Sequence, residues 1–421
     1  MKEKSILDIM KLGGAYIAFC IGSGYATGQE IMQFFSAFGW KSIGAVIISM
    51  VLFVWLGATM MRDGRKLCFK TDTEVWRYYC GNVCCHVLNV FVTFFLFGCF
   101  SIMIGGAGAS LNQYFGIPNV IGRILMAVLC LGTVMLGLNK LVDIIGLIGP
   151  VIIVFSIVIG LGAIFLNADG LMQVNEVLQG IEVSASCSNW AFSGALYTGY
   201  MAILVIPFLL QLSQSAKNTK TAVSGGVFGG FFLVLAILVM NLGLLSNIGA
   251  VYDQEIPTLI LAEQLHPVLA GIFAIIVLMG IFSTAVPMLW MVCRKAGEER
   301  TKKYNLTCVV TVIAALILSM LPFTTLVGTI YPYTGYIGVI LMICVFVKQV
   351  LTLTDASGNL VTMSIPSKNP SAVSCTLSGI EHEYRLGDII YVASAKVSRR
   401  YESYGSKYTR LSHVKFASLN V

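Results

Sequence analysis

The sequence predicts an all-α integral membrane protein that crosses the bilayer ten times and ends in a small β-rich tail. Two observations favour this class. The 421 residues are 57% apolar and only 11% charged, whereas soluble domains carry about 25% charged residues. Residues 1–350 also contain ten apolar segments, each close to the roughly 20 residues that a membrane-spanning helix needs.

The ten predicted spans are separated by alternately basic and non-basic connections. They are residues 10–36, 42–61, 87–114, 118–138, 141–166, 190–213, 221–247, 267–293, 306–324 and 326–349. Lys and Arg concentrate after the second, fourth, sixth and eighth spans, and the long connections 167–189 and 248–266 contain neither. Because cytoplasmic loops are enriched in Lys and Arg, we expect cytoplasmic N- and C-termini in the inner (plasma) membrane of a bacterium.

Ten spans with both ends on one side divide into two halves of five that cross the membrane in opposite senses. This inverted-topology repeat is common in secondary transporters, and its marker is an interrupted helix at matching places in both halves. The first span is interrupted at Gly22, Ser23, Gly24 and Gly28, and the sixth at Ser193, Gly194, Thr198 and Gly199, ahead of Pro207. We therefore predict that spans one and six are broken helices.

A break in a membrane helix frees backbone N–H and C=O groups that need polar partners. The N-terminus of a half-helix suits a carboxylate, and the carbonyls at a half-helix C-terminus suit a cation. In the eighth span, Gly280, Ser283 and Thr284 share one helix face and could offer three oxygens to a small cation. The alternatives are that the glycines serve close helix packing and that the hydroxyls bond to their own helix.

Glu30 is an acidic residue inside the first predicted span, a position that is functional by default. On a continuous helix it would lie about 9 Å beyond Gly24, at 1.5 Å per residue. We therefore expect it near the outer vestibule. It could be a solvated carboxylate, a gate residue or a proton site.

Several strings resemble a known family. The sequence I-G-S-G-Y at 21–25 resembles a signature of the amino acid–polyamine–organocation superfamily. The longer string GSGYATGQEIMQFFSAFG at 22–39 is similar to the YkvI-like family of bacterial permeases, and GGAGASLNQYFGIP at 105–118 and FSTAVPML at 282–289 fit it too. The resemblance implies the leucine-transporter (LeuT-type) fold, with spans one to five and six to ten as the inverted repeats.

The same resemblance implies two sites. The expected substrate pocket consists of Gly22, Ser23, Gly24, Tyr25, Tyr197, Thr198, Gly199 and Tyr200, with the first three holding a substrate carboxylate. The Na⁺ site of sodium-coupled relatives would consist of carbonyls of Ala18, Ile21 and Gly280 and the hydroxyls of Ser283 and Thr284.

Residues 351–421 are expected to form a separate cytoplasmic domain after the membrane domain of residues 1–350. Apolar and polar residues alternate there, and a turn signal at 357–359 predicts a β-hairpin.

The expected function is secondary transport of an amino acid or related zwitterion by alternating access, as Na⁺ symport. Proton coupling and a non-transporting receptor on the same fold are the alternatives. The expected partners are a small-molecule substrate and the lipid bilayer. Because the basic residues lie in short loops and the tail, we expect no nucleic acid. No nucleophile–base set, phosphate loop or metal motif is found in the sequence, so we expect neither an enzyme nor a cofactor other than Na⁺.

Overall fold

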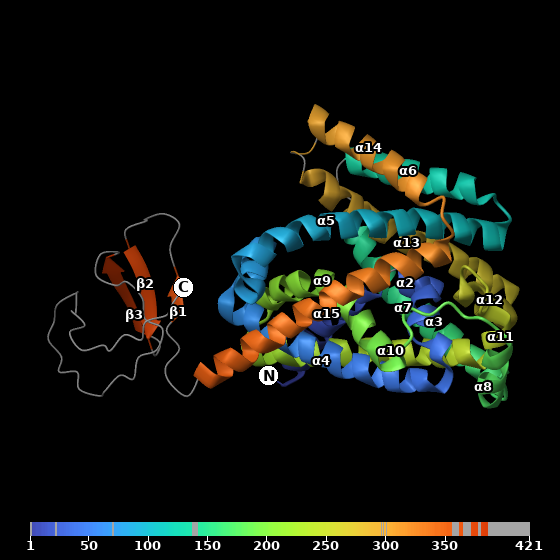
Figure 1. The fold of residues 1–421 in the computed structure, drawn as a ribbon, viewed down its shortest axis with the longest axis horizontal. Helices are drawn as coiled ribbons and strands as arrows, with labels where there is room; N and C mark the ends of the chain where they lie inside the picture. The colour runs from blue at the N-terminus through green and yellow to red at the C-terminus, as the bar shows by residue number, and fades with distance from the viewer. Residues whose placement is uncertain are drawn as a thin grey trace. The chain divides into compact units, whose positions relative to one another are not determined.

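The computed structural model describes residues 2–21, 23–69, 71–136, 142–295, 297, 299, 301–355, 362–364, 372–377 and 380–385. The chain divides into two units, residues 1–343 and 344–421. Helices account for nearly all described residues of the first unit (Figure 1).

The helices follow one another along almost the whole first unit. They are α1 (Lys2–Cys20), α2 (Ser23–Thr27), α3 (Gln29–Phe34), the 3₁₀ helix η1 (Ser36–Lys41), α4 (Ser42–Leu67), α5 (Asp72–Phe115), α6 (Asn119–Leu136), α7 (Val142–Leu166), α8 (Gly170–Gly180), α9 (Trp190–Leu212), the 3₁₀ helix η3 (Ser213–Ser215), α10 (Thr219–Ser246), α11 (Ile248–Val251), α12 (Pro257–Leu265), α13 (Pro267–Arg294), α14 (Lys302–Leu318) and α15 (Phe323–Asp355). Within the described residues, each predicted span overlaps a helix or, for the first span, the series α1–α3, but the ninth span, 306–324, extends beyond the end of α14 at Leu318.

By length and composition, six helical segments of the described chain can cross a membrane, and the bent pair α7–α8 makes a seventh if it counts as one span. The protein is therefore a multi-pass membrane protein. The ten-span count and the inverted repeat remain predictions.

Side chains at the helix starts explain several of these boundaries. Asn189 accepts hydrogen bonds from the backbone N–H groups of Ala191 and Phe192 at the start of α9. His266 caps α13, whose first residue is Pro267. The first N–H groups of a helix have no partner within the helix. Asn189 and His266 accept hydrogen bonds from such groups, and Pro267 has no N–H group that would need a partner.

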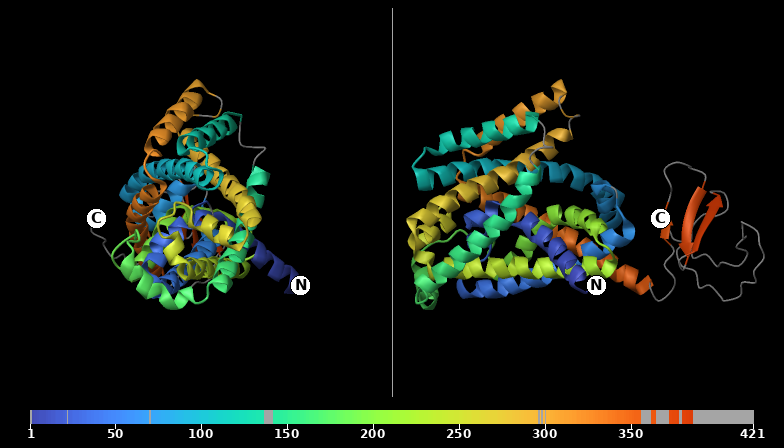
Figure 2. Two further views of the ribbon diagram at one scale, coloured as in Figure 1. Left: turned by 90° about the vertical axis from the view of Figure 1, so that its right-hand side faces the viewer. Right: turned by 180° about the vertical axis from the view of Figure 1, so that it is seen from behind.

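Pairs of glycines let two pairs of long helices, α4 with α10 and α9 with α15, approach very closely. At the crossing of α4 and α10, a Cβ atom built on Gly57 would lie 2.5 Å from the Gly226 carbonyl oxygen, and one built on Gly226 would overlap the Gly57 carbonyl. The Gly199 and Gly338 backbones meet in the same way between α9 and α15. Helices α6 and α14 pack together at one edge of the unit (Figure 2). Backbone-to-backbone packing at small residues is typical of membrane helices.

The predicted break in the sixth span is wrong, because α9 runs without interruption from Trp190 to Leu212. Its glycines serve packing instead. A Cβ atom on Gly194 would overlap the Ala45 carbonyl of α4, and one on Gly199 would lie 2.6 Å from the Gly335 carbonyl of α15. The close-packing alternative therefore describes α9.

The second unit contains three described strands, β1 (Thr362–Ser364), β2 (Ala372–Leu377) and β3 (Ile380–Arg385), which form an antiparallel sheet in the order β1-β2-β3. The first strand of the predicted hairpin, which precedes the turn at 357–359, is wrong, because residues 351–354 continue α15. Its turn at 357–359 lies outside the described residues. The boundary of a β-rich domain after residue 350 stays a prediction.

Candidate functional site

The first span is interrupted twice. Helix α1 ends at Cys20 and α2 begins at Ser23, whereas Gly22 and the Ser23 side chain lie outside the described residues. The second interruption is at Gly28, whose φ of 79° ends α2 before α3. This left-handed conformation favours glycine. A Cβ atom there would also lie 2.7 Å from Thr258 Cγ2.

Hydroxyl groups satisfy carbonyls of the short helix α2. Thr27 Oγ1 donates to the Gly24 carbonyl at 2.8 Å. Thr258 Oγ1, from α12, donates to the Ala26 carbonyl at 2.6 Å. Thr258 lies outside the predicted spans, and no motif marks it in the sequence. These bonds stabilise an irregular backbone that would otherwise be costly at membrane depth.

The expectation that Glu30 lies near a solvated outer vestibule is wrong. Glu30 lies beside the interruption between α1 and α2. Glu30 is 3% exposed. Its carboxyl group packs against the α-carbon of Gly24, where a Cβ atom would overlap Glu30 Oε1. The expected displacement along one helix fails because Gly28 turns the chain. Glu30, which follows the second interruption at Gly28, thus folds back onto Gly24, next to the first interruption.

The Glu30 carboxyl group contacts Tyr200, which belongs to a cluster of aromatic side chains. The Tyr200 hydroxyl, from α9, donates to Glu30 Oε2 at 2.5 Å. The Tyr200 ring stacks on Tyr331 of α15, with centroids 4.7 Å apart, and lies 5.4 Å from the Tyr197 ring. Phe34 of α3 packs against Tyr200 at 5.6 Å. The site therefore combines α2, α3, α9 and α15.

Only part of the expected substrate pocket gathers here. Gly24, Tyr197 and Tyr200 lie near Glu30, as above. The Tyr25 hydroxyl instead donates to the Ala236 carbonyl of α10 at 3.0 Å. Thr198 bonds within its own helix to the Gly194 carbonyl at 3.2 Å, and Gly199 faces α15.

The expected Na⁺ ligands of α13 bond to their own helix. Ser283 Oγ and Thr284 Oγ1 donate to the Gly280 carbonyl at 2.8 Å and 2.9 Å. The partners expected on the other side, Ala18 and Ile21, lie at the end of α1 and just beyond it, and α13 packs against α2. Within the described chain, no cluster of three His, Cys, Asp or Glu side chains could hold a metal ion.

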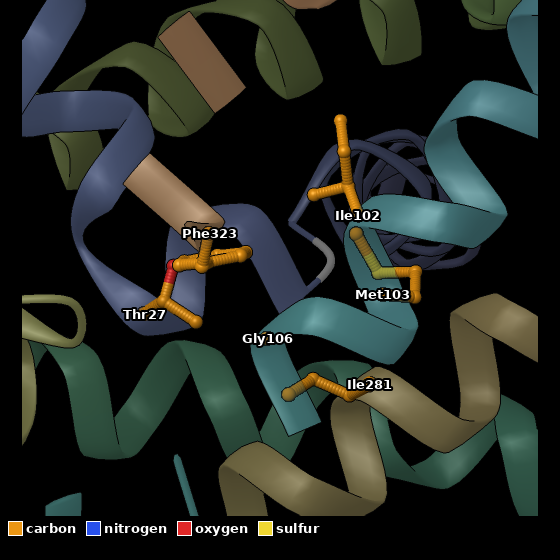
Figure 3. Close-up of a pocket in the computed structure, with 6 residues that line it drawn as sticks. All are labelled: Thr27, Ile102, Met103, Gly106, Ile281 and Phe323. Atoms are coloured by element: carbon orange, nitrogen blue, oxygen red, sulfur yellow. The ribbon is translucent and has the colours of Figure 1, made fainter. Parts of the chain in front are cut away.

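A narrow void lies beside α2 (Figure 3). Its lining consists of Thr27, Ile102, Met103, Gly106, Ile281 and Phe323, and it has no room for a water molecule. Helix α2 is therefore closely packed by α5, α13 and the start of α15 on this side.

The connection before α9 and the first turn of α9 are hydrogen-bonded to α3. The Ser186 N–H donates to the Gln33 carbonyl at 2.9 Å, and Ser193 Oγ donates to the Phe34 carbonyl at 2.6 Å. On the other side, Gln33 Nε2 donates to the Thr324 carbonyl at 2.9 Å. Helix α3, which carries Glu30, is thus held by neighbours distant in sequence.

The buried carboxyl group of Glu30 lies beside an interrupted membrane helix. This arrangement places the chain in the class of membrane proteins that hold a polar site inside an apolar helix bundle. The resemblance to YkvI-like proteins is confirmed: the chain is 25% identical over 340 residues to the uncharacterized membrane protein YkvI of Bacillus subtilis, covering 80% of this chain and 94% of that protein. No family model matches the chain.

Two solved membrane transporters share the fold. One is the Eremococcus coleocola manganese transporter in complex with an aromatic bis-isothiourea substituted compound, with a TM-score of 0.50, 14% identity, and coverage of 85% of this chain and 87% of that chain. The other is Mhp1 in its inward-facing conformation, with a TM-score of 0.50, 12% identity, and coverage of 78% and 73%.

Proposed function

We propose that this protein is a secondary active transporter that moves a small amino-bearing solute across the membrane by alternating access around the break between α1 and α2. The carrying observation is that Glu30, buried among apolar helices, lies against Gly24 at that break. Ionisable groups within a bilayer mark substrate or ion pathways. The two transporters with the same fold support the proposal.

The proposed solute class follows from the charge of the ionisable side chain at the site. The ionisable side chain at the break is a carboxyl group, which attracts an amino group. Amino acids and related zwitterions, the class that the sequence resemblance implies, contain such a group. Na⁺ symport is the proposed coupling, and proton coupling through Glu30 is the alternative.

Counterflow in proteoliposomes tests the function directly. Vesicles loaded with an unlabelled solute should accumulate the same labelled solute, drawn from a panel of amino acids and amines, several-fold above protein-free liposomes. An inward Na⁺ gradient should increase this accumulation. A solute that binds the protein tightly but never crosses under any gradient would favour the receptor alternative.

Sodium coupling is tested by the double variant Ser283→Ala with Thr284→Val. If these hydroxyls bind Na⁺ together with Gly280, their loss should lower Na⁺ affinity about tenfold or more, the equivalent of one charge-assisted hydrogen bond. Because linkage is reciprocal, the enhancement of solute affinity by Na⁺ should shrink equally. Equilibrium binding with and without Na⁺ measures both quantities.

The matched control is Thr307→Val, since Thr307 makes the same kind of bond to its own helix, at 2.9 Å from the Lys303 carbonyl. It should leave the Na⁺ response unchanged. A wild-type protein whose solute affinity ignores Na⁺ would contradict sodium coupling.

A further inference from the structure

Glu30 is a buried acid without a counter-charge. Its side chain forms no ion pair with Lys, Arg or His in the described chain, whose ion pairs include Arg62–Asp63 and Lys217–Asp8. The ionisable groups that interact with it are Cys20 of α1, Cys99 of α5, Tyr197 and Tyr200 of α9, and Tyr331 of α15. None of them carries a positive charge.

A buried carboxylate of this kind needs a positive partner or a proton. Removing an isolated charge from water is very costly, and the group takes up a proton unless it is paired. Tyr200 donates one hydrogen bond to Oε2, but a carboxylate can accept about four. Glu30 therefore retains acceptor capacity for a cation.

The surroundings favour an organic cation over a metal ion. Divalent ions require several oxygen ligands, whereas one hydroxyl group, that of Tyr200, bonds to Glu30, and the rings of Tyr197, Tyr331 and Phe34 pack against Tyr200. Aromatic faces attract ammonium groups through their quadrupole. An ammonium group thus suits both the carboxylate and the rings.

The Glu30 carboxyl group also fills the place that a solute carboxylate would occupy at Gly24, where it packs on the α-carbon. A second carboxylate at the same backbone would face Glu30 at contact distance, and two like charges cannot share such a site unless one is protonated.

We propose that Glu30 binds the ammonium group of a solute that lacks a carboxylate, and that a proton replaces this ammonium group when the site is empty. The proposal rests on the proposed transport function and narrows its substrate class from amino acids to organic amines. A proton and an ammonium group then compete for one carboxylate, which links solute uptake to proton release.

The sign of the pH effect follows from this competition. Lower pH favours protonated Glu30 and weakens ammonium binding, and higher pH strengthens it. The neighbouring Cys20, Cys99, Tyr197, Tyr200 and Tyr331 are neutral when protonated, so they supply no competing cation.

Matched compounds test the solute class on the purified full-length protein in lipid nanodiscs. Benzylamine should bind at least about tenfold more tightly than benzyl alcohol, which lacks the charge, and than phenylglycine, which adds a carboxylate. Benzyltrimethylammonium, whose charge does not depend on pH, should bind more tightly at pH 8.5 than at pH 6.

Variants assign the effect to Glu30. Glu30→Gln should lose the preference for ammonium compounds and the pH dependence, and Glu30→Asp should retain both in weaker form. The control Glu176→Gln, at an exposed position of α8, should behave as wild type. Gel filtration and thermal unfolding establish that each variant is folded.

Three outcomes overturn the proposal: no ammonium compound binds, phenylglycine binds more tightly than benzylamine, or folded Glu30→Gln binds as wild type does. Counterflow separates these results from failure of the proposed function. Flux of amino acids that amines do not inhibit would keep the transporter and reject the ammonium site. Ammonium binding at Glu30 without flux of any solute would keep the site and reject transport.

Discussion

Gly24→Ala is expected to abolish most solute binding while the protein remains folded. The added Cβ would overlap Glu30 Oε1, so the carboxyl group must shift, and we expect the shift to break the hydrogen bond that Oε2 accepts from Tyr200. Loss of a hydrogen bond to a charged group corresponds to about 1.5–3 kcal/mol, or about 10-fold to 100-fold in affinity. Binding of benzyltrimethylammonium and counterflow both measure the loss.

The control for this variant lies in the same span. A Cβ atom on Gly14 of α1 meets no atom within 4 Å, so Gly14→Ala should leave binding unchanged. A double-mutant cycle adds a sharper test, because Gly24→Ala should cost little in a Glu30→Ala background, where the overlapping atoms are gone. Wild-type binding by Gly24→Ala would contradict the placement of Glu30 at the break.

Gly57→Ala is expected to reduce stability strongly, although alanine favours a helix over glycine by about 1 kcal/mol. The new methyl group would lie 2.5 Å from the Gly226 carbonyl oxygen and 2.9 Å from Tyr16 Cε1, and a carbonyl cannot rotate away as a side chain can. Overpacking of this kind costs about 1–3 kcal/mol or more. Thermal unfolding in nanodiscs should show a lower midpoint, with transport reduced in proportion to the folded fraction.

Gly132→Ala is the matched control, because Gly132 of α6 is exposed and a Cβ atom there meets nothing within 4 Å. It should be as stable as wild type or slightly more stable. Equal stability of Gly57→Ala and Gly132→Ala would show that the crossing of α4 and α10 tolerates separation.

The sequence could predict the interruption in the first span, because its glycines adjoin polar Gln29 and Glu30. It could not predict the continuity of α9. Glycine suits a break and a tight helix contact equally well, and only the neighbouring backbone decides. For Gly194 and Gly199 that backbone is Ala45 and Gly335.

The position of Glu30 was beyond sequence reasoning for a related reason. Counting residues along a helix is valid only while the helix continues, and Gly28 ends it with a positive φ. The same limit applies to residues 351–354, where four alternating residues fit a strand but extend α15. Local patterns identified the helices, whereas long-range packing determined where they stop.

The contrast between the segmented first span and continuous α9 has a mechanical consequence. The part of α9 that contacts Glu30, residues 190–206, is continuous helix ahead of Pro207, whose missing N–H interrupts the hydrogen-bond pattern of the helix only at that residue. The first span, by contrast, can change direction at Ile21 and Gly28 through a few dihedral angles. Opening of the site would then alter α2 and α3 while residues 190–206 of α9 move as one body. The balance between open and closed forms would depend on very few backbone positions, so a single substitution at Ile21 or Gly28 could shift it without touching the solute.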